Sequence, residues 1–149
     1  MKTKLKKYSN EEALKKLMHY CSYQDRCHQE VSKKLYEWGF PKYDADDLIV
    51  RLIEEDFLNE ERFARAFARG KFKMKKWGRQ KIRYMLKQKS INDKLISLAL
   101  GEIDEEGYRA TLKETIEKKS KQVDGRNKYH REQKIFQYCL NRGFEAELI

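Results

Sequence analysis

The sequence repeats itself, and this repetition constrains the fold more than any other feature. Three acidic starts recur, each an Asn or Asp followed by two glutamates: Asn10-Glu11-Glu12, Asn59-Glu60-Glu61 and Asp104-Glu105-Glu106. Asn and Asp are favourable N-caps, and glutamates in a first turn suit the positive end of the helix dipole. Apolar residues follow four and eight positions after each Asn or Asp: Leu14 and Met18, Phe63 and Phe67, Tyr108 and Leu112. This spacing is typical of one buried helix face, so we expect a helix at each start.

A second series recurs in the same order, at offsets of 51 and 53 residues. Its members are Val31, Leu35, Gly39 and Phe40, then Ile82, Leu86, Ser90 and Ile91, then Ile135, Cys139, Gly143 and Phe144. Gly39 and Gly143 are expected to end helices, because glycine readily takes the left-handed conformation that closes a helix. A third element begins with Leu-Ile each time: Leu48-Ile49, Leu95-Ile96 and Leu148-Ile149.

These repeats predict an all-α fold, an elongated tandem array of three three-helix units in which each unit touches mainly its neighbours. The third unit is expected to be truncated at the C-terminus, with its last helix incomplete. We expect a basic N-terminal extension at 1–9 and units at 10–58, 59–103 and 104–149. Helices are expected near 10–21, 24–38, 44–56, 59–75, 79–89, 92–102, 105–121 and 128–142. No stretch alternates with a strand period, so no sheet is predicted.

Composition excludes several classes of protein. No apolar run approaches the roughly 18 residues needed to span a bilayer, and MKTKLKKYSNEE has no apolar segment behind its charges, so it is not a signal peptide. The three cysteines are odd in number and widely spaced, which fits reduced thiols better than a disulfide framework. We therefore expect a cytoplasmic helical protein that is monomeric and has no membrane partner.

Catalytic and metal-binding patterns are missing from the sequence. His19, His28 and His130 are scattered, and the dipeptide Cys27-His28 has no second pair at zinc-ligand spacing. No glycine-rich phosphate loop is present, and no nucleophile has a plausible base. We predict no catalytic residues, no metal site, no cofactor and no enzymatic activity.

The positive charge is concentrated in one segment, residues 62–92, which carries twelve Lys or Arg and no Asp or Glu. The net charge of the chain is +10, so the other 118 residues together carry about −2. Lys and Arg attract phosphates without regard to sequence, and exposed aromatic rings stack on unpaired bases. The candidates for contact with a partner or nucleic acid are Arg62, Arg65, Arg69, Lys71, Lys73, Lys75, Lys76, Trp77, Arg79, Lys81 and Arg83.

Helical spacing divides this segment. Arg62, Arg65 and Arg69 follow i, i+3, i+7 spacing and are expected to share a helix face, whereas Phe63 and Phe67 belong to the core. Trp77 could either pack or contact a partner. The alternative for the whole segment is a solvated helix face with no partner.

An acidic section precedes the basic one. Residues 44–61 hold eight acids against one base: Asp44, Asp46, Asp47, Glu54, Glu55, Asp56, Glu60 and Glu61 against Arg51. Acidic and basic sections side by side make a dipolar surface that can meet both a protein filament and the nucleic acid inside it. The alternative is that Asp56 and Glu60-Glu61 only cap the following helix.

Three such units, with DFLNEERFARAFARGKFKMKKWGRQKIRYMLKQKSI across the middle one, resemble the RecX family of bacterial recombination regulators. The most specific match runs from Asp56-Phe57-Leu58 into Glu61-Arg62-Phe63-Ala64, with Arg69, Gly78, Ile82, Leu86 and Lys89-x-Ile91 after it. Unit one matches at Leu14, Arg26, Glu30, Leu35 and Gly39-Phe40, and unit three at Lys134, Arg142 and Gly143-Phe144. The chain departs from the family at Ser90, where glycine is usual, and in the missing last helix.

The resemblance implies a non-enzymatic regulator that binds the RecA recombinase filament on single-stranded DNA. Such a regulator inhibits or modulates the ATPase, strand-exchange and SOS-inducing activities of RecA in recombination and DNA repair. Two alternatives stay open: a basic helical nucleic-acid-binding protein that acts on DNA without RecA, and an RNA-binding protein. The triple repeat favours the RecA regulator over these alternatives, because a partner that lies along a filament groove needs length, whereas a protein that reads duplex DNA needs one recognition helix.

Overall fold

Polar caps determine where most of the helices begin. In the computed structural model, which describes residues 5–149, five of the eight α-helices start behind a Ser, Asn or Asp whose side chain accepts a hydrogen bond from the first turn. Asn59 and Asp104 are caps, as predicted. At the first start the prediction was wrong by one residue, because the cap is Ser9. Ser9 and Glu12 bond each other's backbone N–H at 3.2 Å in a capping box.

The helices are α1 (Asn10–Tyr23), α2 (His28–Glu37), α3 (Lys42–Glu54), α4 (Glu60–Lys75), α5 (Arg79–Gln88), α6 (Asp93–Leu100), α7 (Glu105–Ser120), α8 (Lys128–Asn141) and the short 3-10 helix η1 (Ala146–Leu148). No described residue lies in a strand, and all eight predicted α-helices are present. The largest boundary error is at α2, which begins at 28 and not at 24. Its cap is Cys27, whose N–H donates to the Glu30 carboxylate at 3.1 Å.

The units close their second helices in the same way. Phe40, Ile91 and Phe144 each donate a backbone N–H to the carbonyl five residues earlier, at 3.0, 3.1 and 3.1 Å. The residue before each has a positive φ: 80° at Gly39, 62° at Ser90 and 102° at Gly143. Ser90 thus adopts the conformation that glycine provides in the other two units, and the predicted repeat is confirmed at the level of single hydrogen bonds.

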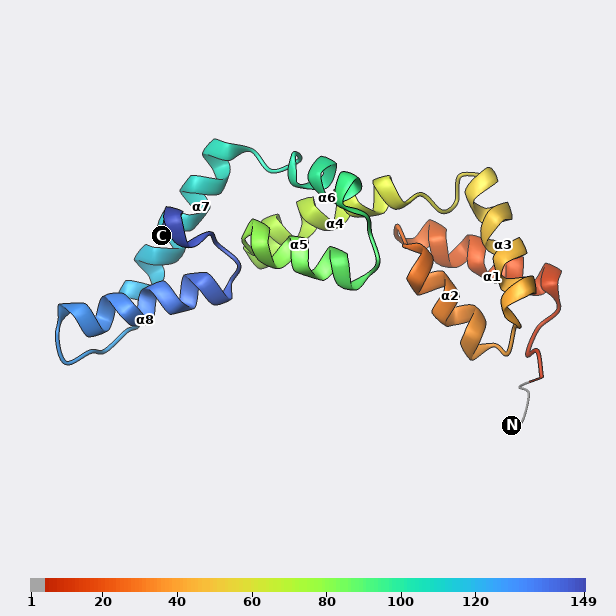
Figure 1. Ribbon diagram of the computed structural model, residues 1–149, viewed down its shortest axis with the longest axis horizontal. Coiled ribbons are helices and arrows are strands. Elements are labelled where there is room, and N and C mark those ends of the chain that lie inside the picture. The colour runs from red at the N-terminus through yellow and green to blue at the C-terminus, as the bar shows by residue number, and fades with distance from the viewer. Residues whose placement is uncertain (1–4) are drawn as a thin grey trace.

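The helix groups lie in a row, so the predicted elongated array is confirmed (Figure 1). We call α1–α3 unit one, α4–α6 unit two, and α7, α8 and η1 unit three. The chain starts at the unit-one end of the row and finishes in unit three. The described part of the expected basic extension is tied to unit one, because the N–H of Lys7 donates to the Trp38 carbonyl at 2.8 Å. Residues 1–4 of that extension lie outside the described residues.

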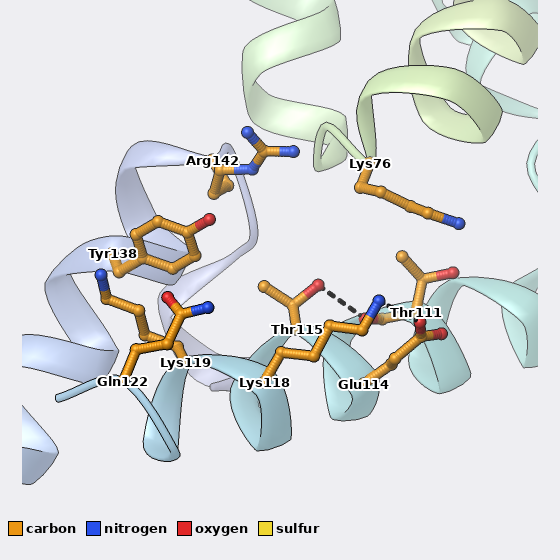
Figure 2. Close-up of a pocket in the computed structure, with 9 residues that line it drawn as sticks. All are labelled: Lys76, Thr111, Glu114, Thr115, Lys118, Lys119, Gln122, Tyr138 and Arg142. Atoms are coloured by element: carbon orange, nitrogen blue, oxygen red, sulfur yellow. Dashed lines mark hydrogen bonds and ion pairs between the residues drawn. The ribbon is translucent and has the colours of Figure 1, made fainter.

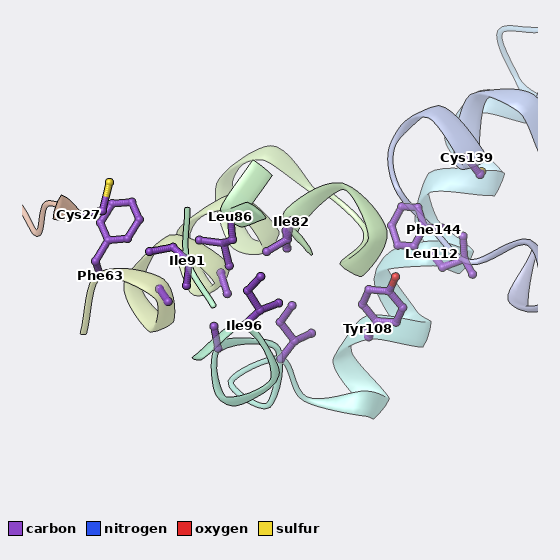
Figure 3. Packing of buried hydrophobic residues seen from close by; sticks show 14 residues of the cluster. Cys27, Phe63, Ile82, Leu86, Ile91, Ile96, Tyr108, Leu112, Cys139 and Phe144 are labelled. Atoms are coloured by element: carbon purple, nitrogen blue, oxygen red, sulfur yellow. The ribbon is translucent and has the colours of Figure 1, made fainter. Parts of the chain in front are cut away.

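Two hydrophobic cores hold the described residues together. Unit one has its own, which includes the fully buried Leu17, Leu35 and Leu52. Units two and three share the other, shown in Figure 3. It passes from one unit to the next through Tyr108, whose ring centroid lies 5.8 Å from Phe72 and 5.3 Å from Phe144. The core of these two units is therefore continuous.

The two phenylalanines predicted for the core of α4 differ in burial. Phe63 is buried, whereas Phe67 is half-buried and lies 5.8 Å from Phe63 and 6.4 Å from Trp77, centroid to centroid. Cys27 of unit one is fully buried at the end of the shared core, next to Phe63 (Figure 3). Unit one therefore contributes one small apolar side chain to the core of its neighbour.

Units two and three meet where the start of α5 lies against the end of α8. The N–H of Gly78 donates to the Arg142 carbonyl at 2.8 Å, and the N–H of Gln80 donates to the Gly143 carbonyl at 2.9 Å. A Cβ atom on Gly78 would lie 2.2–2.3 Å from backbone atoms of Gly143 and Phe144. Only glycine at position 78 allows the two backbones to approach this closely.

Units one and two meet through the equivalent helix ends but with side chains in place of backbone. The amide of Gln29, near the start of α2, donates to the Gln88 carbonyl at the end of α5 at 3.1 Å. Glu30 and Lys89 form an ion pair at 3.6 Å across the same contact. The second helix of each unit thus begins against the end of the second helix of the next.

We predict that Gly78→Ala destabilises the contact between units two and three. The added methyl group must displace backbone, and the two hydrogen bonds lengthen, so the free energy of unfolding should fall by about 2–4 kcal/mol in thermal or urea denaturation. Gly70→Ala is the matched control. Nothing lies within 4 Å of a Cβ there, in the middle of α4, and it should stabilise the protein by about 0.5–1 kcal/mol. Equal effects of the two changes would contradict the close approach.

Candidate nucleic-acid interface

The basic segment folds into most of α4, a turn and α5. Lys76 ends α4 in the left-handed conformation, with a φ of 57°, and the N–H of Trp77 donates to the Lys71 carbonyl at 3.2 Å. Gly78 then forms the N-cap of α5. The eleven candidate residues therefore divide between a helix, a tight turn and the next helix, and their environments differ.

Three of the arginines in α4 are bound to acids of the same chain. Arg62 pairs with Asp25 of the α1–α2 loop at 2.7 Å and with Asp56 at 3.2 Å. Its Nη2 also donates to the carbonyls of Asp56 and Phe57 at 3.0 and 3.3 Å. The hydrogen bond to Asp25 raises the pKa of the Arg62 guanidinium. Arg62 therefore ties α4 to unit one.

Arg65 and Arg69 share one acid at the end of α6. Their guanidinium groups lie 3.1 and 3.2 Å from the same oxygen of Glu102, and Arg65 also pairs with Glu61 at 3.0 Å. The hydrogen bond to Glu102 raises the pKa of Arg65. These contacts hold α4 to α6 within unit two, and they occupy the face of α4 that the spacing of the arginines predicted.

Arg79 joins units two and three at the first residue of α5. Its guanidinium pairs with Glu105 at 2.9 Å and with Glu145 at 2.8 Å, and lies 4.0 Å from the centre of the Tyr108 ring. The Tyr108 hydroxyl donates to Glu145 and accepts the N–H of Arg79 at 2.9 Å. Burial raises the pKa of Tyr108, and the hydrogen bond from Arg79 lowers the pKa of Glu105.

The five candidate lysines and the last candidate arginine are in a different situation from these arginines and from Lys87 and Lys89, which pair with Asp93 and Glu30. Within the part of the chain that the structure describes, no carboxylate pairs with Lys71, Lys73, Lys75, Lys76, Lys81 or Arg83. Lys73, Lys75, Lys76 and Arg83 are exposed. Lys71 and Lys81 lie 5.1 and 4.5 Å from the ring centre of the half-buried Trp77, which packs against the shared core. Six cations of this segment, two of them beside the Trp77 indole, are thus not paired with a carboxylate of the described chain.

The turn also faces unit three. Lys76 and residues of α7 and α8 line a pocket of about 160 Å³, whose other cations are Lys118, Lys119 and Arg142 (Figure 2). One acid is present, Glu114, and it pairs with Lys118 at 2.9 Å. These unit-three cations were not among the predicted site residues, although the run Lys118-Lys119-Ser120-Lys121 is present in the sequence.

Other kinds of site find little support in residues 5–149. No group of three His, Cys, Asp or Glu side chains in this range could hold a metal ion. Cys21, Cys27 and Cys139 are buried, and burial raises the pKa of the Cys27 thiol to about 11, which keeps it protonated at neutral pH. None of the described helices is both long and apolar enough to cross a bilayer.

Comparison with known protein families identifies all three units. The family descriptions that match are "RecX, first three-helix domain" at residues 13–52, "RecX, second three-helix domain" at 59–100 and "RecX, third three-helix domain" at 106–149. The chain belongs to the RecX family. Regulatory protein RecX of Prosthecochloris aestuarii is 31% identical over 92% of this chain and 88% of its own length. Regulatory protein RecX of Streptococcus uberis is 27% identical over 89% of this chain.

Solved structures of RecX proteins have the same fold. A crystal structure of regulatory protein RecX superposes with a TM-score of 0.85 at 24% identity, over 93% of this chain and 68% of that one. RecX from Lactobacillus salivarius gives 0.82 at 23% identity, over 93% and 90%. The chain spans about half the length of several relatives, including that of Streptococcus uberis. The relatives are named regulatory proteins and not enzymes.

We predict that Arg79→Gln weakens the junction between units two and three in a pH-dependent way. Loss of the partly exposed ion pairs should lower the free energy of unfolding by about 1–2 kcal/mol at pH 7. The pKa of Glu105 is lowered from 4.5 in the folded state, so its contribution is present above that pH and is lost as the pH falls below it. The difference between wild type and variant in urea denaturation should therefore narrow below pH 4.5. Arg83→Gln, at an exposed arginine without an ion pair, should have no such effect. A pH-independent difference would contradict the assignment.

Proposed function

We propose that this protein binds the RecA recombinase filament on single-stranded DNA and restrains its ATPase, strand-exchange and SOS-inducing activities. Membership of the RecX family supports a regulatory role in the context of RecA. The observation that carries the proposal is the combination of an elongated row of units with one strongly cationic turn in its middle unit. In this proposal the row lies along the filament, and the lysines of the turn contact its DNA.

The proposed DNA contacts are the six cations of the segment that have no carboxylate partner, of which Lys71 and Lys81 lie beside Trp77. Lys73, Lys75 and Lys76 are exposed at the end of α4, and Arg83 is exposed on α5. Arg62, Arg65, Arg69 and Arg79 are assigned a different role, because a phosphate would have to displace carboxylates from them. Their role is to hold the units in the arrangement that presents the lysines.

The proposed protein contact is the outer face of α3 in the acidic section. Tyr43, Val50 and Ile53 are exposed there to 78%, 49% and 42%, and helical spacing puts them beside Asp46, Asp47 and Glu54. These three acids are exposed and form no ion pair with another described residue, so the face is both apolar and negative. The charge difference between this face and the cationic turn suits a partner assembly in which protein and DNA lie side by side.

We predict that the protein suppresses the DNA-dependent ATPase of RecA at concentrations up to that of RecA itself. The double change Val50→Ser with Ile53→Ser should weaken this suppression about tenfold, because it removes apolar contacts but no charge. Its DNA binding without RecA should be unchanged. Leu140→Ser, at a comparably exposed apolar residue of α8, is the control and should behave as wild type.

The ATPase assay also separates this proposal from its alternative. A protein that leaves RecA turnover and filament length unchanged at micromolar concentration, yet binds DNA, would be a nucleic-acid-binding protein that acts without RecA. A chain that suppresses RecA and loses this ability in the α3 variant would support the filament proposal.

The cationic turn is tested by salt dependence. We predict that changing Lys73, Lys75 and Lys76 together to Gln weakens binding to single-stranded DNA and lowers the log–log salt slope by about 2 units, because each lost phosphate contact removes roughly 0.7. The fold should survive, since exposed substitutions usually change stability by less than about 0.5 kcal/mol. Changing Lys94, Lys113 and Lys128 to Gln removes the same charge elsewhere on the surface and should leave the slope unchanged. Equal slopes for the two triple variants would mean that the turn is a solvated face.

A further inference from the structure

Unit one carries a second cationic surface, outside the segment that the sequence singled out. A groove of about 500 Å³ lies along α1 and α2 and is lined by nine residues, none of them Asp or Glu. Four of the nine are aromatic: Tyr8, Tyr20, Tyr23 and Trp38. Four others are Lys or Arg: Lys15, Lys16, Arg26 and Lys34. We call this surface the unit-one groove.

The aromatic rings of the groove are held in place by their neighbours. Tyr8 and Trp38 meet edge to face, with centroids 5.2 Å apart and planes at 87°. The backbone bond from Lys7 to Trp38 fixes the segment that carries Tyr8. Tyr20, in the last turn of α1, is half-buried. Tyr23 differs, because it is 79% exposed and no contact with its ring is recorded in the described residues.

The cations of the groove are ordered around these rings but leave most of their donors unused. Arg26 lies 3.7 Å from the centre of the Tyr20 ring, and its Nε donates to the Tyr20 carbonyl at 3.1 Å. Lys16 lies 4.7 Å from the centre of Tyr8, and Lys34 lies 5.4 Å from that of Tyr20. None of these cations pairs with a carboxylate of the described chain, which contrasts with Arg62, Arg65 and Arg79.

We infer that the unit-one groove is a binding site for single-stranded nucleic acid, in which a base stacks on Tyr23 and the flanking phosphates meet the Lys and Arg side chains. Aromatic rings beside unpaired cations are the combination that single-strand binding surfaces use. The bases of a duplex are already stacked on one another and cannot stack on Tyr23, so the groove should prefer single strands. The lining of the groove holds four Lys or Arg and no Asp or Glu, so the site favours an anionic partner.

The surface around the groove limits where the strand can run. A neighbouring hollow shares Tyr20 and Lys34 with the groove but is also lined by Glu30 and Glu37. Its two carboxylates offset two of its three lysines, so phosphates are attracted more strongly to the groove, whose lining holds no acid. The inference does not require RecA, and it concerns residues that the proposed function does not use.

The test measures binding of two fluorescent probes by anisotropy: an oligo(dT) strand and a strand of the same length without bases. Tyr23→Ala should bind oligo(dT) about 5- to 150-fold more weakly, because base–aromatic stacking contributes about 1–3 kcal/mol per base. It should bind the abasic strand as wild type does. Tyr23→Phe should restore oligo(dT) binding, since the ring and not the hydroxyl is needed.

The control is Tyr129→Ala, which removes an equally exposed tyrosine, 70% accessible, at the start of α8 in unit three. It should leave both probes unaffected. Unchanged oligo(dT) binding by Tyr23→Ala would overturn the inference, and so would an equal loss of affinity for the abasic strand.

A third contrary result involves a polyglutamate peptide. If this peptide displaces oligo(dT), and if Tyr23→Ala weakens peptide binding as much as it weakens oligo(dT) binding, the groove binds an acidic protein segment instead.

Failure of this inference can be told apart from failure of the proposed function. The triple Gln variant of the cationic turn should lower binding of both probes and lower the salt slope, whereas Tyr23→Ala should affect one probe and leave the slope unchanged. Neither measurement contains RecA, so the ATPase result stands independently of both.

Discussion

At each junction between units, a glutamate joins the starts of two helices. Arg79 is the first residue of α5, where the helix dipole disfavours a positive charge. It is stabilised there by Glu105, in the first turn of α7, and by Glu145. His28 occupies the equivalent place in α2, and its backbone N–H donates to Glu60, in the first turn of α4, at 3.1 Å. Each junction therefore joins the start of one unit's second helix to the start of the next unit's first helix, with a glutamate between them.

Arginine and lysine have different roles within the basic segment, because the contacts between helices need side chains that bind carboxylates firmly. Arginine forms two-pronged contacts with carboxylates and carbonyls, whereas lysine is a strongly hydrated point charge that remains at the surface. Four of the five arginines that were candidates hold α4 or α5 to acids from elsewhere in the chain. The five candidate lysines, from Lys71 to Lys81, have no such partners among the described residues, although Lys87 and Lys89 further along the segment do pair with acids. The segment is uniformly cationic in sequence, but most of its arginines hold the fold together. In the proposed interface, the positive charge that a partner meets therefore comes mainly from lysine.

The sequence predicted what short-range chemistry determines. Helix starts, the glycine-type helix ends and the threefold repeat all depend on residues within a few positions of one another, and Ser90 shows that the closing bond forms even without glycine. The acids that pair with the arginines could not be predicted from the sequence, because they are distant along the chain. Arg62 and Asp25 are 37 residues apart, and Arg79 and Glu145 are 66 apart. The unit-one groove was missed for the same reason, because its rings come from the N-terminal segment, α1 and the end of α2.

The two junctions differ in strength, and this difference follows from what meets at each. Units two and three share backbone hydrogen bonds at Gly78 and a continuous aromatic core through Tyr108. Units one and two are joined by partly exposed polar pairs and by the single small side chain of Cys27. Polar contacts in water contribute less than buried apolar area, so we expect motion between units to be concentrated at the first junction. In the arrangement that we propose, the more firmly joined pair of units carries the cationic turn, and unit one carries the groove. Because the two proposed surfaces belong to one chain, binding at either would raise the effective concentration of the other near the same strand.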